Sequence, residues 1–203
     1  MIKKDDNIIL IIGNGPSILK YNFGRMIENF KNVGRINNFK IKNYSNNIGS
    51  NTSIWFNGGN QNLIIPKIIP EKIIVFVPYD LQKKDFNKIV KRTTKRLKVG
   101  DKEYTLIKKS EMLKYEKITN IKRPTTGLNS ILWSMQKYKT VLIHGFDFFE
   151  KNNDHYYDSF FIKKIANLKR FLKVDKHDHI AEKKFVTKLI KDKKIFTLKE
   201  YLK

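Results

Sequence analysis

The chain has 203 residues, of which 40% are hydrophobic, so it can bury one sizeable core, and we expect a single domain over residues 1–203. Its 42 lysine and arginine residues against 19 aspartate and glutamate residues give a formal net charge of +23, which makes anionic partners the first to consider. The absence of cysteine excludes disulfides and thiolate metal sites, while the lack of a long apolar run or a secretory signal pattern predicts a soluble, cytoplasmic protein.

Apolar runs alternate along the chain with longer segments of helical period, which is typical of an α/β domain with a mostly parallel sheet. Strands are expected at 8–12, 32–36, 53–57, 72–77 and 140–144. Between the last two strands, residues 79–122 are charged and contain the turn signal VGDKEYT. This segment predicts a helix and a small hairpin or lid.

Two segments in the second half of the chain show the spacing of a helix that packs one face on a sheet. The first is 126–138, where apolar residues recur at Leu128, Ile131, Leu132 and Met135. The second lies near the end, with Phe185, Val186, Leu189 and Ile190. We therefore predict a Rossmann-like domain whose central sheet is flanked by helices.

The basic residues are spread along the chain, with runs at 83–98 and 163–176, and show no zinc-knuckle or basic-zipper spacing. Nucleic acid is therefore not the expected partner. The charge fits a solvated lysine-rich surface, which we favour, or peripheral contact with an anionic membrane or a polyanionic glycan surface.

The first expected strand runs straight into the stretch Gly13, Asn14, Gly15, Pro16 and Ser17. A glycine-flanked exit from a strand exposes backbone N–H groups and lets a ribose or phosphate approach. GNGPS is neither the dinucleotide fingerprint nor the phosphate loop, so neither NAD nor a triphosphate is indicated. By itself, the stretch favours a tight structural turn.

Five stretches, in order along the chain, resemble the motifs of the sialyltransferases. IIGNGPSILK resembles the start of their large donor-binding motif, in a form closer to the bacterial family 42 than to the animal family 29. Residues 33–57 continue that motif, with Arg35-x-Asn37 and a Gly-Ser-x-Thr at 49–52, as in family 29.

The other three stretches lie in the second half of the chain. Residues 123–149 are similar to the small motif, in which Thr-Gly opens a helix and the next strand ends in Gly-Phe. HYYD at 155–158 resembles the third motif, and HDHIAE at 177–182 resembles the final one. Together, the order and spacing of the five stretches make chance similarity a poor explanation.

The resemblance implies a sialyltransferase-type variant of the GT-A fold. It also implies an inverting, metal-independent enzyme that transfers sialic acid or a related acidic sugar from a CMP-sugar donor to a glycan or glycolipid hydroxyl. No cofactor or metal is expected beyond that donor. Residues 79–122 are the candidate for a lid or acceptor-side insertion.

The residues implied for donor binding come from four places in the chain. Asn14 and Asn37 stand where the family hydrogen-bonds the nucleotide, although asparagine also forms turns. Thr126 and Gly127 open the expected helix, whose free N–H groups attract a carboxylate or phosphate, although a plain threonine cap is the alternative. The full donor set is Gly13, Asn14, Gly15, Ser17, Asn37, Asn57, Thr125, Thr126 and Gly127.

For catalysis, the resemblance implies that His155, Tyr156 and Tyr157 stabilise the leaving phosphate and that His177 is the general base. His177 is preferred over His179 because it stands five residues before Glu182, as the family's histidine does before its acid. An imidazole with an ordinary pKa of about 6.5 suits that role. The alternatives for HDH are a helix start capped by Asp178 and, more remotely, a metal pair.

Two further residues are expected to be structural. Asp147 lacks the second aspartate of an Asp-x-Asp metal pair, and His144 ends an apolar strand and should be packed in the core.

The chain departs from the animal family in lacking its membrane anchor and its disulfide, so family 42 is the nearer precedent for its environment. The acceptor, and the choice between sialic acid and other CMP-linked acidic sugars, stay open. The alternative function is a non-catalytic, basic module of the same fold that binds nucleotides or nucleic acid.

Overall fold

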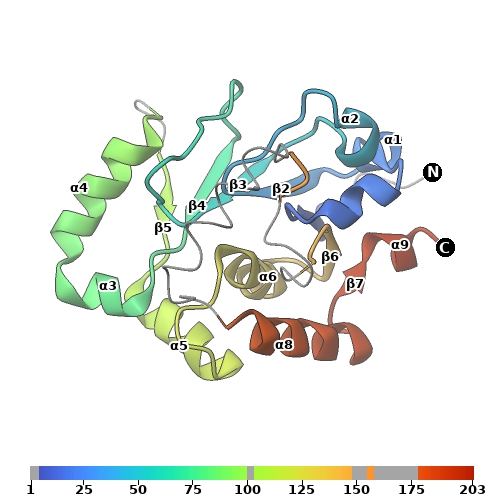
Figure 1. Cartoon of the computed structure of the whole chain (residues 1–203). Helices are drawn as coiled ribbons and strands as arrows, with labels where there is room; N and C mark the ends of the chain where they lie inside the picture. Colours follow the sequence, from blue (N-terminus) through green and yellow to red (C-terminus); the bar gives the residue numbers. More distant parts are fainter. Residues whose placement is uncertain (1–4, 100–102, 148–154, 158–177) are drawn as a thin grey trace, which may run out of the picture.

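The computed structural model describes residues 5–99, 103–147, 155–157 and 178–203 (Figure 1). Within these residues the strands form a seven-stranded sheet of order β5-β4-β3-β2-β1-β6-β7. Every pair of neighbouring strands is parallel. The predicted α/β class with a parallel central sheet is confirmed.

All five predicted strands are present, although two are shorter than expected. The strands are β1 (Ile8–Ile12), β2 (Asn32–Ile36), β3 (Ile54–Asn57), β4 (Lys72–Val75), β5 (Thr105–Leu106), β6 (Thr140–His144) and β7 (Phe196–Thr197). The central strands β1, β2 and β6 are buried on both faces, which is why β1 and most of β6 are apolar. β2 is the exception, because its buried Asn32 and Arg35 side chains are held by hydrogen bonds.

The predicted helices are confirmed as α6 and α8, and several shorter helices accompany them. The helices are η1 (Pro16–Lys20), α1 (Gly24–Ile27), α2 (Ser45–Ile48), α3 (Tyr79–Lys84), α4 (Phe86–Leu97), α5 (Lys109–Thr119), α6 (Thr126–Lys137), α8 (His179–Lys191) and α9 (Leu198–Tyr201).

The helices form a layer on each face of the sheet. Along β1, Ile9 and Ile11 belong to a core with α5, α6 and α8, whereas Leu10 and Ile12 belong to a core with α1, α2 and α9. The alternation follows from the two-residue period of a strand. Figure 1 shows α5, α6 and α8 together below the sheet and α4 at its left side.

The segment 79–122 differs from the prediction. It holds two helices before β5 and one after it, and β5 pairs in parallel with β4 instead of forming a hairpin. The hairpin prediction is wrong because α4 buries Ile89 and Leu97 against the sheet and carries the chain back, so the next strand enters in the same direction. Its predicted role as a lid stays a prediction.

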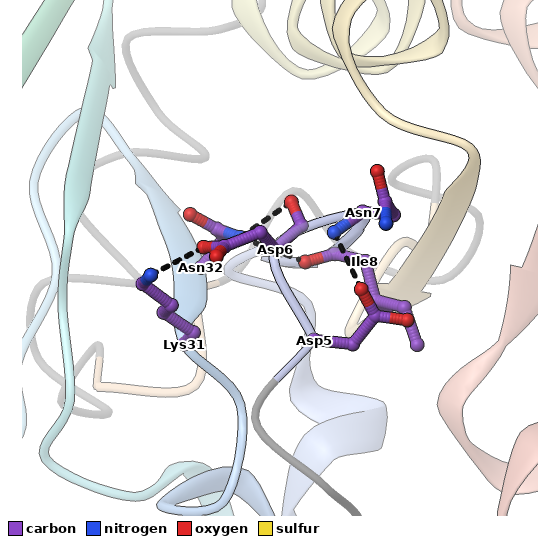
Figure 2. A network of polar contacts seen from close by, with 6 residues as sticks. All are labelled: Asp5, Asp6, Asn7, Ile8, Lys31 and Asn32. Carbon is purple, nitrogen blue, oxygen red and sulfur yellow. Dashed lines mark hydrogen bonds and ion pairs between the residues drawn. The ribbon is translucent and has the colours of Figure 1, made fainter.

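A polar network fixes the starts of β1 and β2, as Figure 2 shows. Asn32 donates from Nδ2 to the carbonyls of Asp6 at 3.2 Å and Ile8 at 3.1 Å, and Asn7 N donates to Asp5 Oδ1 at 2.8 Å. Lys31 and Asp6 form an ion pair nearby. Because this network lies at the amino end of the strands, it sets their register without occupying the edge where ligands bind in such folds.

Candidate functional site

The order of the strands reverses between β1 and β6, since the chain moves outward from β1 to β5 on one side and continues at β6 on the other. In open α/β sheets the carboxyl ends of strands at such a switch point form the usual ligand crevice. Gly13 follows β1, Asn37 follows β2, and Asn57 ends β3. The predicted donor residues therefore share this edge.

The glycines after β1 allow a close approach of the chain after β6. Gly13 N donates to His144 O at 2.8 Å, and Gly15 N donates to Gly145 O at 2.9 Å. A Cβ on Gly13 would lie 2.4 Å from Gly145 O, so no larger residue fits there. Packing of the two strand ends accounts for these glycines, and their predicted contact with a donor stays a prediction.

Asp147 is structural, as predicted. Its carboxylate accepts a hydrogen bond from Ser17 N at 2.7 Å and another from Ser17 Oγ. A Cβ on Gly15 would lie 2.5 Å from the Asp147 Cγ. The carboxylate therefore occupies the space beside the turn and holds the start of η1.

Residues 36–40, which we call the Asn37 turn, begin at the last residue of β2. Asn37 has a left-handed backbone, with a φ of 49°. Its Oδ1 accepts a hydrogen bond from Gly58 N at 3.0 Å, which joins the ends of β2 and β3. Asn14 donates from Nδ2 to the carbonyls of Ile36 and Asn38, both at 3.0 Å. The two predicted nucleotide-binding asparagines are therefore brought together.

The tyrosines after β6 also hold the Asn37 turn. Tyr156 Oη donates to Lys40 O at 2.7 Å and accepts a hydrogen bond from Lys40 N at 2.8 Å, and Tyr157 Oη donates to Asn38 O at 2.8 Å. Burial raises the pKa of Tyr156 to about 12, so its phenol stays protonated near neutrality. His155 stacks on Tyr157 with their ring centroids 5.2 Å apart. These contacts do not test the predicted role of the three residues at a phosphate.

Arg35, the arginine of the Arg-x-Asn stretch, is buried and holds the chain that leads into β3. Its guanidinium donates to the carbonyls of Ile48 and Gly49 and to Thr52 Oγ1. Burial lowers the pKa of Arg35 to about 10. This tie explains why the arginine and the 49–52 stretch occur together in the sequence.

The start of α6 lies against the end of β3. Thr125 is the N-cap, and its Oγ1 accepts a hydrogen bond from Leu128 N at 3.2 Å. Thr126 opens the helix, as predicted, and a Cβ on Gly58 would lie 3.0 Å from its Oγ1. Asn57 is fully buried nearby, and within the described residues its Nδ2 has no hydrogen-bond partner. Free N–H groups of the first turn of α6 therefore lie close to the end of β3.

Glu182 has a role that the sequence analysis missed. From α8, its carboxylate accepts a hydrogen bond from Thr125 N at 2.6 Å and one from Thr125 Oγ at 2.7 Å. Only 3% of Glu182 is exposed. The sequence contains a sign of this role, because Glu182 lies on the same helical face as Phe185 and Val186. A carboxylate on an apolar face that packs on the core needs a hydrogen-bond partner.

His177, the predicted base, lies outside the described residues, as does Asp158 of the third stretch. The next residue, Asp178, caps α8 and accepts a hydrogen bond from Ala181 N at 2.9 Å, so a helix does start at HDH. His144 is packed beside Phe23, as predicted, with ring centroids 5.5 Å apart.

Two negative findings concern the described part of the chain. No group of three histidine, aspartate or glutamate side chains there is placed to hold a metal ion. None of its helices has the length and apolar character needed to cross a bilayer.

Comparison with known proteins points to one family. The model for glycosyltransferase family 29 (sialyltransferase) matches residues 63–194. No curated protein sequence matches the chain.

Solved structures show the same fold at low sequence identity. A mammalian sialyltransferase in complex with Gal-beta-1-3GalNAc-ortho-nitrophenol has a TM-score of 0.68 and 17% identity, over 95% of this chain and 69% of that chain. Another structure of a mammalian sialyltransferase has a TM-score of 0.69 and 17% identity, over 95% of this chain and 68% of that chain. The sialyltransferase CstII from Campylobacter jejuni, in complex with the substrate analogue CMP-3FNeuAc, has a TM-score of 0.56 and 18% identity, over 94% of this chain and 81% of that chain. These similarities confirm the predicted sialyltransferase-type fold.

Proposed function

Since the chain belongs to glycosyltransferase family 29, the sialyltransferases, we propose that it transfers sialic acid or a related acidic sugar from a CMP-sugar to a glycan hydroxyl. The observation that carries this proposal is the meeting of Asn14, Asn37, Asn57 and the start of α6 at one edge of the sheet. The complex of CstII with CMP-3FNeuAc supports a CMP-linked donor, because that protein shares the fold.

The nucleotide is proposed to bind beside the Asn37 turn. Asn37 Oδ1 is engaged by Gly58 N, and no hydrogen bond of its Nδ2 occurs within the described residues. That amide is suited to donate to the cytidine. Asn14 is engaged through Nδ2 with the turn itself, so its contribution is to hold Asn37 in place.

The acidic part of the donor is proposed to bind at the start of α6. The N–H groups of Thr126 and Gly127 lie in the first turn of a twelve-residue helix, where the helix dipole favours a negative charge. Asn57 at the end of β3 is a further candidate contact at this edge of the sheet, because its Nδ2 is buried and has no hydrogen-bond partner within the described residues. A carboxylate or phosphate oxygen would satisfy these groups.

The proposed reaction is a direct displacement with inversion. The acceptor oxygen attacks the anomeric carbon, the bond from that carbon to the phosphate oxygen breaks, and its electron pair leaves with CMP. We assign His177 to take the acceptor proton and His155 to the leaving phosphate. Tyr156 and Tyr157, whose hydroxyls donate to the Asn37 turn, are assigned to hold that turn, and serving the phosphate would require them to release it. The leaving group is already a phosphate monoester, so the proposal needs no metal. A cytoplasmic location is proposed from the lack of cysteine.

Calorimetry with CMP in excess EDTA tests the donor site. Asn37→Ala should weaken binding by about 1–3 kcal/mol, which is the usual cost of removing a buried polar partner. Asn46→Ala, at an exposed position of α2, is the matched control and should bind CMP like the parent. Loss of all binding in EDTA would contradict the metal-free proposal, and equal binding by the Asn37 variant would remove the turn from the donor site.

A further inference from the structure

The connection from β3 to β4 leaves two isoleucines in solvent. Leu63, Ile65 and Ile69 pack on the core that contains Trp55 and Val75. The intervening residues Ile64 and Ile68 are 65% and 87% exposed. A single exposed apolar residue is ordinary, but two large ones within five residues of an irregular segment have no structural function in the described fold.

The same segment lies beside the last turn of α4. Arg96 Nη1 donates a hydrogen bond to Gly59 O at 2.7 Å, and Leu97 shares the core on which Leu63 and Ile65 pack. Figure 1 shows the teal segment after β3 and the end of α4 both at the upper edge of the view. The connection that carries the exposed isoleucines is therefore attached to the last turn of α4.

The outer face of α4 is basic and lacks acidic residues. The helix buries Ile89, Thr93 and Leu97, which places Lys88, Lys91 and Lys95 at the exposed surface. Residues 86–98 contain six lysines and arginines and no aspartate or glutamate. Among the described side chains, lysines and arginines form ion pairs at Lys31, Lys114 and Arg123, all outside α4. The positive charge of this face is therefore not neutralised from within the described fold.

We propose that Ile64, Ile68 and the basic face of α4 form a docking surface for a bilayer that contains anionic lipid. The lysines are attracted to acidic headgroups, and the isoleucines gain free energy by entering the hydrocarbon boundary. The isoleucines decide between partners, because neither a nucleic acid nor a polyanionic glycan offers hydrocarbon to cover them. Ile64 N donates to Asn38 Oδ1 of the Asn37 turn at 2.8 Å, so this surface adjoins the proposed donor site, although its isoleucine and lysine side chains are not among the proposed donor contacts.

Co-sedimentation of the full chain with vesicles tests the surface. The chain should bind vesicles of phosphatidylcholine mixed with phosphatidylserine and should bind phosphatidylcholine alone weakly. Ile64→Ser combined with Ile68→Ser should lower binding to the mixed vesicles about tenfold or more. Ile180→Ser is the matched control, because Ile180 is 85% exposed on α8, away from this surface, and it should bind like the parent.

Lysine substitutions on two helices distinguish an effect of the α4 face from an effect of the net positive charge of the whole chain. Lys88→Gln, Lys91→Gln and Lys95→Gln together should lower vesicle binding roughly tenfold to a hundredfold. The same change at Lys184, Lys188 and Lys191 of α8 should have a much smaller effect. Unfolding curves of each variant show whether it is folded.

Several results would overturn the proposal. Equal vesicle binding by the folded isoleucine variant and the parent would do so, as would equal losses in the α4 and α8 lysine series. Binding to a DNA duplex or to heparin that is tighter than vesicle binding and insensitive to the isoleucine changes would assign the charge to a polyanion instead. None of these results depends on transferase activity, so the proposed function is tested separately.

Discussion

The contacts of Tyr156 in the structure differ from the contact with a leaving phosphate that the sequence predicted. Its hydroxyl makes hydrogen bonds with both the N–H and the carbonyl of Lys40, and it is 5% exposed. Because this hydroxyl both donates to and accepts from the backbone of Lys40, it fixes the Asn37 turn. To serve a leaving phosphate as well, it would have to release Lys40.

We therefore expect Tyr156→Phe to raise KM for the donor more than it lowers kcat. The change frees the Asn37 turn, and an unpaired buried group costs about 1–3 kcal/mol. Steady-state kinetics with CMP-sialic acid measures both constants. Phe23→Leu, in the aromatic group beside His144, is a packing control without a hydroxyl. A fall in kcat at unchanged KM would instead assign the phenol to the transition state.

His144 should make stability depend on pH. Burial lowers its pKa from 6.5 to about 4, opposed by the charge of Asp147. Between these values the unfolded chain binds a proton that the folded chain does not, so the free energy of unfolding should fall as the pH drops from 6.5 to 4. Removing the group with His144→Leu should flatten that fall by roughly 1–3 kcal/mol, as denaturant unfolding across this range would show. Parallel pH curves for the two proteins would contradict this account.

At the scale of elements, Glu182 joins α8 to the start of α6. Glu182→Gln replaces one acceptor oxygen by an NH2 group that faces the donating groups of Thr125, so stability should fall by about 1–3 kcal/mol. Urea unfolding measures the loss. Glu200 is the matched control, since it accepts the same two hydrogen bonds from Thr197 but is exposed, and Glu200→Gln should cost less. A larger loss at Glu200 would show that burial does not determine the effect.

The longer strands and helices could be predicted from the sequence, because their apolar residues form continuous runs or recur with the spacing of a helix. β1 and β6 are continuous apolar runs, and α6 shows a regular stripe from Leu128 onward. The two-residue β5 has no such pattern, and its position depends on where α4 returns the chain. Elements of this length are defined by tertiary contacts, which a local pattern does not contain.

At the scale of the whole molecule, the resemblance of five stretches predicted the family and the fold, while composition and periodicity alone predicted only an α/β domain. The resemblance also predicted that Asn14 and Asn37 act together, and the structure brings them to the carboxyl edge that the parallel strands share. Their contact with a nucleotide stays a prediction. It could not show that Tyr156 and Tyr157 bond to the Asn37 turn, since those contacts join residues 116 and 119 positions apart. The role of His177 stays a prediction.

The rate of sugar transfer from CMP-sialic acid tests the central claim most directly, measured as CMP release in the presence of acceptor and excess EDTA. The parent should turn over, and His177→Ala should bind CMP nearly as well while transferring roughly 100-fold to 10,000-fold more slowly, as expected for loss of a general base. His179→Ala should have a much smaller effect. No CMP release by the folded parent would contradict the CMP-sialic acid assignment, and an undiminished rate in folded His177→Ala would contradict the proposed base.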